Sequence, residues 1–381
     1  MSRGGRVAEV ARLFAVLGAT AFGGPAAHVA MMRREFVERR GWEDEQTFVD
    51  LVGLTALLPG PNSTELAIEM GRRRAGTAGL VAAGVAFVVP AALLVGAIAA
   101  AYERYGTTPA ADDLRGGILP VVVAIVAHAT WALGRTAVRG PLTAVIAVAA
   151  FAAQLAGVHE LVILAVGAAA GGLWAARGRL ATGASSVLLV TLPAALAAPA
   201  AVSRGGDPGE SVGLAQLAWS FLRIGATLFG SGYVIVAFLE SEFVDRLGAL
   251  TPTELLDAVT VGQVTPGPVF TTATFVGYVT DGPWGAAVAT VAIFLPAFLL
   301  IAALGRFVGP ALRSPTARPL LDGLNAAAVG LIAAAAVGLA DDGVTSALGV
   351  ALAVIALALL LRTKLNATWL VLAGALLGPL A

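Results

Sequence analysis

The amino-acid sequence repeats itself, and this repetition limits the folds that the chain can adopt. Residues 218–244 resemble residues 11–37, and the same register places Pro59-Gly60-Pro61 over Pro266-Gly267-Pro268. After a gap of one residue, further glycine and proline positions continue to match. Low-complexity apolar sequence aligns easily by chance, but glycine and proline punctuation that matches over roughly 80 residues indicates a duplicated structural unit.

Long apolar stretches separate this chain from soluble proteins. Only 13% of its 381 residues are charged and 58% are hydrophobic, whereas about 25% of the residues in an ordinary soluble domain are charged. Residues 80–101, 118–133 and 344–361 are examples of apolar runs, and they approach the ~20 residues that a helix needs to cross a bilayer. The sequence therefore predicts an all-α polytopic membrane protein.

The predicted organisation is two homologous halves joined by an extra segment. We expect the first repeat over residues 1–180, an extra apolar segment and a polar linker over 181–212, and the second repeat over 213–381. Each repeat contains six apolar segments, so the single segment at 186–202 starts the second repeat on the opposite side of the membrane. This arrangement is an inverted repeat, which is common in secondary transporters.

Charged loops predict the orientation of the chain in a bacterial inner membrane. Arginine-rich loops, such as those at Arg135, Arg177 and Arg306, are expected in the cytoplasm, and Asp341 is expected outside. The N-terminus would then be cytoplasmic and the C-terminus external. The basic N-terminal residues run into an apolar segment without a clear small-residue cleavage site, so we interpret this segment as part of the mature protein.

The first two apolar segments of each half allow two arrangements. They either cross the membrane or form re-entrant hairpins that enter and leave on one side. Crossing segments would put Arg33 and Arg34 outside, against the tendency of arginines to remain in the cytoplasm. Hairpins would keep these arginines in the cytoplasm together with Arg72. Hairpins are therefore favoured, and they give nine full spans rather than thirteen.

Several classes of function are disfavoured by what the chain lacks. Its formal net charge is zero, so no overall field favours nucleic acid as a partner. The absence of cysteine excludes a disulfide framework, a thiol nucleophile and an iron–sulfur cluster. Neither HExxH nor GxSxG occurs, and no other catalytic constellation is evident. We therefore expect no enzymatic activity, cofactor or metal.

Each half has two breaks inside its apolar segments. The breaks are Phe22-Gly23-Gly24-Pro25, Leu58-Pro59-Gly60-Pro61, Phe229-Gly230-Ser231-Gly232 and Thr265-Pro266-Gly267-Pro268. Pro-Gly-Pro cannot continue a helix, because proline lacks the amide donor and clashes with the preceding turn. A new helix that starts there presents free N–H groups and a partial positive charge.

The breaks predict an anion site. Unpaired backbone at membrane depth is tolerated only where it is buried in protein or lines a cavity. Four helix starts, two from each inverted half, would converge near the midplane, and helix N-termini are suited to binding anions. A tetrahedral dianion with four acceptor oxygens fits this geometry. As an alternative, the breaks act only as kinks that help the helices to pack.

At these residues the chain resembles the chromate ion transporter family in its long two-domain form. The first-half signature comprises residues 22–28 (FGGPAAH) and 58–65 (LPGPNSTE), and the second-half partners comprise residues 229–233 (FGSGY) and 265–269 (TPGPV). The resemblance covers nearly the whole chain. It implies export of chromate driven by the membrane gradient, with sulfate as a close structural analogue. The residues alone would suit several anions, and they leave open whether the protein forms a homodimer.

The breaks and their neighbours supply the candidate substrate-binding residues. These are Gly23, Gly24, Pro25, His28, Pro59, Gly60, Pro61, Asn62, Ser63, Thr64, Gly230, Ser231, Gly232, Pro266, Gly267, Pro268 and Thr271. The hydroxyl and amide groups among them can donate hydrogen bonds at the helix starts, and ordinary capping is a compatible role.

Two ionisable side chains beside the first-half breaks are candidates for proton coupling. Glu65 follows Pro-Gly-Pro closely, and ionisable groups within membranes are functional candidates by default. The alternative for Glu65 is a capping box in which Asn62 caps the helix. His28 either carries a proton near neutral pH or has a structural role. The second half has Thr272 and Ile235 at these places, so either role breaks the symmetry.

Other charged residues near the breaks have simpler interpretations. Glu69 lies one turn beyond Glu65, and an ion pair with Arg72 or Arg73 is favoured there.

Other solutes are the main rival substrates. Cation sites usually contain acidic side chains within the spans, and only Glu65 and Glu69 approach that here, so the donor-rich breaks favour an anion. A membrane-embedded enzyme is a more distant rival.

Overall fold

The structure is a computed structural model that describes residues 2–21, 24–55, 58–106, 108–177, 212–228, 234–304, 317–344, 346–363, 365 and 367–378. Within these ranges the regular elements are all helical. The first half contains α1 (Arg3–Thr20), α2 (Gly24–Arg33), η1 (Arg34–Arg39), α3 (Glu45–Thr55), α4 (Asn62–Tyr105), α5 (Pro109–Ala137), α6 (Pro141–Leu155) and α7 (Glu160–Ala176). The second contains α9 (Leu214–Thr227), α10 (Ile235–Leu239), η2 (Glu240–Arg246), α11 (Pro252–Val264), η3 (Val269–Thr271), α12 (Thr272–Leu304), α14 (Ala317–Gly343), α15 (Ala347–Arg362) and α16 (Ala367–Leu377). The extra segment expected at 186–202 lies outside the described residues.

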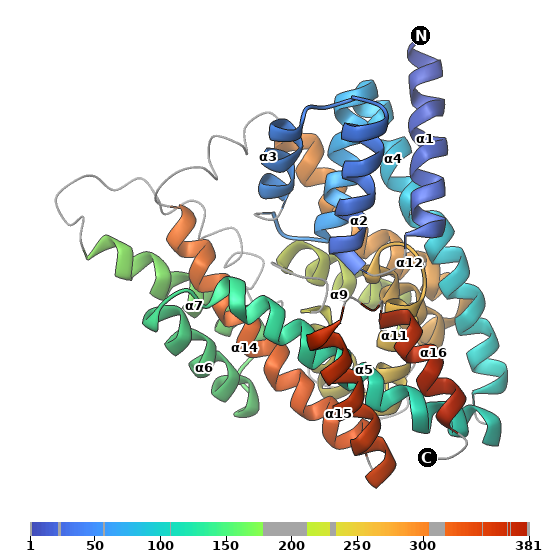
Figure 1. Cartoon of the computed structure of the whole chain (residues 1–381), viewed down its shortest axis with the longest axis vertical. Coiled ribbons are helices and arrows are strands. Elements are labelled where there is room, and N and C mark those ends of the chain that lie inside the picture. The colour runs from blue at the N-terminus through green and yellow to red at the C-terminus, as the bar shows by residue number, and fades with distance from the viewer. Residues whose placement is uncertain are drawn as a thin grey trace.

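The first four helices form two hairpins that open toward the same end of the molecule. Glu9, near the start of α1, pairs with Arg40 just beyond η1 and with Arg74 in α4. Arg73 pairs with Glu43, which precedes α3. These ion pairs hold the outer ends of α1, η1, α3 and the first arm of α4 together, at the top of Figure 1. Each of the first two apolar segments therefore turns back on itself, as the hairpin arrangement requires, and its re-entrant position in the membrane stays a prediction.

Helix α4 reverses direction at Ala75-Gly76. Gly76 has φ of +70°, which a glycine adopts without strain. A Cβ atom at Gly71 would lie 2.3 Å from the carbonyl oxygen of Gly79, so the two arms of α4 are in backbone contact at the bend. The arm that follows Gly76 runs to Tyr105, and its length of about 43 Å is enough to cross a bilayer.

The second half repeats this geometry at equivalent residues. The rings of Phe14 and Phe36 lie 5.2 Å apart, and those of Phe221 and Phe243 lie 4.9 Å apart. Helix α12 bends at Gly282, where φ is +59°. These matches confirm the two homologous halves that the repeated sequence predicts.

The long second arms of α4 and α12 pack against each other in opposite directions. Gly84, near the start of the α4 arm, faces Phe298 near the end of α12. Tyr102, near the end of α4, stacks edge-on at 5.1 Å against Phe275 in the first arm of α12. The neighbouring Thr274 is hydrogen-bonded to Thr290, which lies in the first half of the second arm, so the end of α4 lies beside that part of the arm. Equivalent helices are therefore antiparallel, and the predicted inverted repeat is confirmed.

The two halves exchange their last helices. α6 and α7 pack against α14 of the second half, and α15 and α16 pack against α5 of the first half (Figure 1). The repeats predicted over 1–180 and 213–381 are thus units of sequence that do not form two separate bodies.

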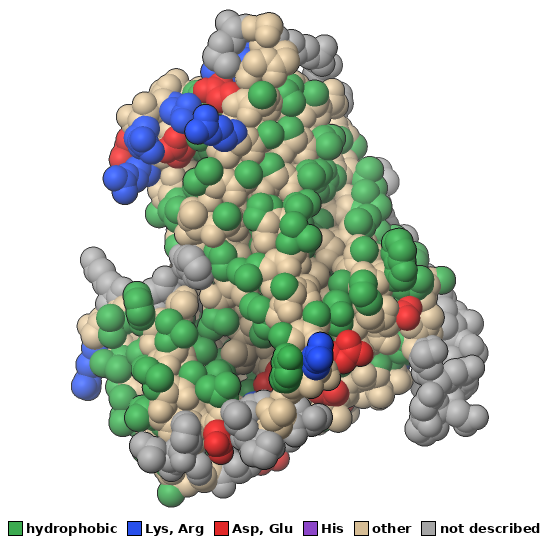
Figure 2. Space-filling model, turned by 90° about the vertical axis from the view of Figure 1, so that its right-hand side faces the viewer, with side chains coloured by type: hydrophobic (Ala, Val, Ile, Leu, Met, Phe, Trp, Pro, Cys, Tyr) green, Lys and Arg blue, Asp and Glu red, His purple; other side chains and the backbone are tan. Residues whose placement is uncertain are grey.

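Four described helical segments are long and apolar enough to cross a membrane. They are Asn62–Tyr105, Asp113–Ala137, Val269–Ala303 and Arg318–Asp341. Helices α6, α7, α15 and α16 are apolar but shorter, so the total of nine spans stays a prediction. Figure 2 shows basic side chains gathered toward the upper end of one face, with a broad apolar surface below them. Such a surface suits contact with lipid.

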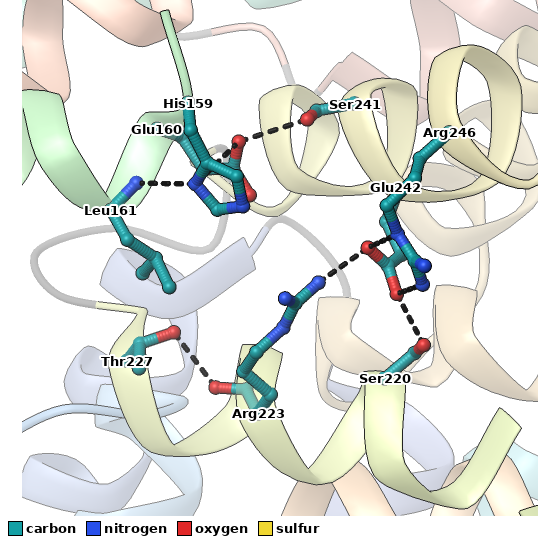
Figure 3. Close-up of polar contacts among 9 residues, drawn as sticks. All are labelled: His159, Glu160, Leu161, Ser220, Arg223, Thr227, Ser241, Glu242 and Arg246. Carbon is teal, nitrogen blue, oxygen red and sulfur yellow. Dashed lines mark hydrogen bonds and ion pairs between the residues drawn. The ribbon is translucent and has the colours of Figure 1, made fainter. Parts of the chain in front are cut away.

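Glu242 closes the first hairpin of the second half. Its carboxylate, only 2% exposed, accepts hydrogen bonds from Ser220 and Arg223 of α9 and from Arg246 of η2 (Figure 3). Nearby, Ser241 donates to Glu160 of α7 over 2.8 Å. These bonds tie η2 to α9 and to a helix of the first half.

Glu242 also gives the protein a predicted pH dependence. Burial raises the pKa of Glu242, but hydrogen bonds from Arg246 and Ser220 and the charges of Arg223 and Arg246 outweigh this, so the pKa lies below its ordinary 4.5. A group with a lowered folded-state pKa stabilises the fold above its unfolded-state pKa and loses this contribution as the pH falls. We expect the melting temperature to fall below about pH 4.5, and to fall less steeply in Glu242→Gln. Equal slopes in both proteins would contradict this assignment.

Candidate functional site

Two reciprocal backbone hydrogen bonds join the breaks of the two halves. The amide of Gly60 donates to the carbonyl oxygen of Leu228 over 2.7 Å, and the amide of Gly267 donates to that of Ala21 over 2.9 Å. Gly60 and Gly267 are equivalent in the two repeats, as are Ala21 and Leu228. The contact therefore has the form of an isologous interface. Each Pro-Gly-Pro break is fixed to the end of the other half's first helix.

The central glycine of each Pro-Gly-Pro is required by its backbone conformation and by close packing. Gly60 has φ of +133° and Gly267 has φ of +93°, in the region that favours glycine. A Cβ atom at Gly267 would lie 2.5 Å from the Cβ of Ala91 and 2.8 Å from the carbonyl oxygen of Gly18. The chain crosses itself here at backbone contact.

The helices that follow the two breaks start differently. Pro61 is the N-cap of α4, and helical structure begins directly at Asn62. In the second half, η3 intervenes and α12 begins at Thr272. Thr271 donates its hydroxyl to the carbonyl oxygen of Pro268 over 2.8 Å. The Thr271 hydroxyl, which was predicted to bind substrate, therefore donates its hydrogen bond to the backbone of its own turn.

His28 bridges three parts of the site. It is 1% exposed, its Nδ1 lies 3.1 Å from the Ser63 hydroxyl, and its Nε2 lies 3.1 Å from the carbonyl oxygen of Ala21. A carbonyl only accepts hydrogen bonds, so Nε2 carries a proton and, in the neutral ring, Ser63 donates to Nδ1. The Ala21 carbonyl also accepts from Gly267. His28 thus links α2, α4 and the crossing point, which favours the structural alternative for this residue.

The capping box, which was the alternative role for Glu65, does not form at α4. No side chain caps the start of this helix. Instead, Asn62 accepts a hydrogen bond from the Thr55 hydroxyl of α3 over 2.6 Å. The amide oxygen that was expected to cap α4 therefore joins the two arms of the second hairpin.

Glu65 is buried without a partner. It is 0% exposed, and neither carboxylate oxygen has a hydrogen-bond partner among the described residues. A Cβ atom at Gly60 would lie 2.7 Å from its Oε1, so the carboxylate turns back over the Pro-Gly-Pro break. The adjacent Thr64 hydroxyl is buried and, in the same part of the chain, also lacks a partner. An uncompensated buried polar group is costly and calls for an explanation.

Gln263 is a polar residue of the site that sequence reasoning missed. It lies near the end of α11, shortly before Pro266, and is 7% exposed. Its Nε2 is buried and has no hydrogen-bond partner within the described ranges. A glutamine in an apolar segment just before Pro-Gly-Pro was the available signal.

The remaining predicted residues divide into three groups. Gly24 and Pro25 begin α2, and Pro59, Pro61, Pro266 and Pro268 flank the two crossing glycines. Gly23, Gly230, Ser231 and Gly232 lie outside the described residues.

Charged residues near the outer ends of the first-half hairpins form ion pairs. Both carboxylate oxygens of Glu69 accept hydrogen bonds from the Arg72 guanidinium, which is the expected ion pair. The Glu69 side chain is nevertheless buried. Arg33 pairs with Glu45 and Glu38. No group of three or more metal-ligating side chains comes together in the part of the chain that the structure describes.

Comparison with known proteins gives the family. A family model described as Chromate transporter matches residues 8–173 and, separately, residues 215–379. The chain belongs to the chromate transporter family. The two matched regions correspond to the two inverted halves, so the breaks lie at equivalent places in two copies of the family unit. With its apolar helices, family membership makes the chain a multi-pass membrane protein.

Members of the chromate transporter family in several bacteria resemble the whole chain. A chromate transport protein of Pseudomonas aeruginosa is 32% identical over 96% of this chain and 90% of its own length. A chromate transport protein of Cupriavidus metallidurans is 31% identical over 97% of this chain and 91% of its own length. A probable chromate transport protein of Synechococcus elongatus is 33% identical over 86% and 83%. No solved structure matches the chain.

Proposed function

We propose that this protein exports chromate across a bacterial inner membrane, accepts sulfate as an analogue, and couples this movement to the proton gradient. The observation that carries the proposal is that each Pro-Gly-Pro break is bonded to the end of the other half's first helix, with the buried, unpartnered Glu65 beside Gly60. Similarity to relatives named chromate transport proteins supports chromate as the substrate. The arginine-rich end that holds the hairpin openings would face the cytoplasm.

The donors at the breaks are suited to an oxyanion. The first turn of α4 presents backbone N–H groups and the positive end of the helix dipole. Thr64 offers a buried hydroxyl and Gln263 a buried amide, both without partners among the described residues. Neutral donors that lack partners lose least when an anion binds, because they exchange no existing bond for the new one.

Glu65 supplies the link to protons in this proposal. A dianion at the start of α4 and an ionised Glu65 would repel each other strongly, since both would be buried in a low-dielectric region. Anion binding therefore favours a protonated Glu65, and a proton on Glu65 favours anion binding, because linkage is reciprocal. A proton and the dianion that move outward together carry one net negative charge, so the membrane potential, negative inside, drives this export, and the flux also responds to an imposed pH gradient.

The inverted halves suggest how the site is exposed alternately. The hairpins of the first half open at one end, and the antiparallel second half has the same elements in the opposite direction. Rocking of one half against the other around the Pro-Gly-Pro breaks would open the site to each side in turn.

The test is labelled chromate movement in proteoliposomes that contain only this protein and carry an imposed pH gradient. We expect flux that follows the gradient and that excess sulfate reduces. Absence of chromate movement, in protein shown to be folded and inserted, would rule out chromate as the substrate. Sulfate flux without chromate flux would make the protein a transporter of another inorganic anion.

A further inference from the structure

A groove runs along the outer side of the first hairpin, and the Pro-Gly-Pro breaks do not line it. It encloses a cavity of about 640 Å³ between one face of α1, from Gly5 to Leu17, and the residues Glu35, Arg39 and Arg40 of η1 and its end. The opposite face of α1 packs on α4. The groove is therefore bounded by both arms of one hairpin at the end where the ion pairs gather.

The walls of the groove carry charges of both signs at one level, where arginines outnumber Glu9 and Glu35, and are apolar at the next. Arg12 and Arg39 lie beside it, and Leu13, Val16 and Leu17 continue it toward the inner end of α1. Glu35 already pairs with Arg39 and Arg40. Among the described residues, Arg12 has no carboxylate or other polar partner. Its guanidinium is thus available at the mouth of an apolar groove.

The second half provides an internal comparison for this groove. Arg223 occupies the place of Val16 and reaches across to Glu242, the counterpart of Glu35 (Figure 3). Trp219 stands where the first half has Arg12. An arginine at the Val16 position therefore ties the two arms together, whereas valine leaves the space between them open in the first half.

We propose that this groove binds an anionic phospholipid such as phosphatidylglycerol. Arg12 and Arg39 would hold the lipid phosphate, because guanidinium groups form charge-assisted bonds with phosphate oxygens. One acyl chain would lie along Leu13, Val16 and Leu17, below the arginines. Basic residues next to membrane helices attract anionic lipid in this way, and their apolar stems reach along the chains. The bound lipid would bridge α1 and η1 in the first half, as Arg223 bridges the equivalent arms in the second.

The test compares thermal unfolding in nanodiscs of phosphatidylcholine with increasing fractions of phosphatidylglycerol. We expect a saturable rise in melting temperature, because a ligand that binds only the folded state stabilises it. Arg12→Gln should raise the half-saturating fraction about fivefold. Val16→Arg, which fills the groove and can pair with Glu35, should abolish the rise. Arg6→Gln is the matched control, since Arg6 is exposed on α1 but does not line the groove.

Each other outcome would overturn the proposal. An unchanged lipid response in Arg12→Gln would show that Arg12 does not hold the phosphate, even if Val16→Arg failed to fold. An equal response to inorganic phosphate or chromate in detergent would assign the groove to a free oxyanion. A change of oligomeric state in Val16→Arg with no lipid effect would make the groove a contact between copies of the chain. The proposal does not depend on the transported substrate.

Discussion

Replacing Glu65 with glutamine is expected to reduce chromate flux driven by a pH gradient at least about tenfold while chromate exchange without a gradient continues. Glutamine keeps the shape of the side chain but cannot carry the proton that Glu65 would exchange. It also mimics the protonated acid, so the anion still finds an uncharged neighbour at the start of α4. The measurement is labelled chromate movement in proteoliposomes, made once with an imposed gradient and once as exchange against unlabelled chromate.

Glu69→Gln is the control for this experiment. Glu69 lies one turn further along α4 and pairs with Arg72, so the same substitution there should leave coupling intact. Gradient-driven flux that survives in Glu65→Gln would exclude Glu65 as the proton carrier. Loss of both driven flux and exchange, in folded protein, would assign it a role in holding the break instead.

Gly267→Ala is expected to destabilise the protein by about 3 kcal/mol or more. Alanine is strained at a φ of +93°, and such backbone strain alone costs of order 1–3 kcal/mol. Its Cβ would also meet the Ala91 Cβ at 2.5 Å and the Gly18 carbonyl oxygen at 2.8 Å. Neither neighbour is the end of a flexible side chain, so the backbone must shift. The measurement is the midpoint of thermal or denaturant unfolding.

Two glycines serve as comparisons for Gly267. Gly41→Ala should cost much less, because φ is +58° there but nothing lies within 4 Å of the added atom. Gly60→Ala should have an intermediate effect on stability, since the nearest atom is Oε1 of Glu65, which can swing away. A Gly267→Ala protein as stable as Gly41→Ala would show that the crossing is not tightly packed.

Much of the fold could be predicted from the position of glycine and proline. Pro-Gly-Pro at 59–61 and at 266–268 interrupts helices wherever it occurs, and its repetition revealed the duplication. The arginines that follow the first and the second hairpin, such as Arg33 and Arg72, favoured a re-entrant arrangement, because crossing segments would have put them on opposite sides of the membrane. The inferences of the duplication and of the hairpins succeeded because they depend on local backbone chemistry and on counting charges.

Contacts between distant segments could not be predicted in the same way. The Asn62-to-Glu65 spacing fits a capping box, but Pro61 rather than Asn62 is the N-cap of α4, Asn62 accepts from Thr55 of another helix, and Glu65 is unpaired among the described residues. The exchange of helix pairs between the halves leaves no trace in the local pattern of apolar residues. Gln263 stood out only once burial was known. The donor set of the site therefore required the three-dimensional structure.

The reciprocal bonds between the halves also bear on how the chain is made. When the first half leaves the ribosome, the Gly60 amide has no partner and the Ala21 carbonyl has only His28, because Leu228 and Gly267 have not yet been synthesised. Helices α6 and α7 likewise lack α14, against which they pack in the complete protein. The insertion machinery must therefore shelter an incomplete first repeat until the second arrives, and a ribosome that stalls between the repeats would release a product exposed to membrane proteases. Expressing the halves as two separate polypeptides in one cell would restore a stable protein only if each finds its counterpart before degradation.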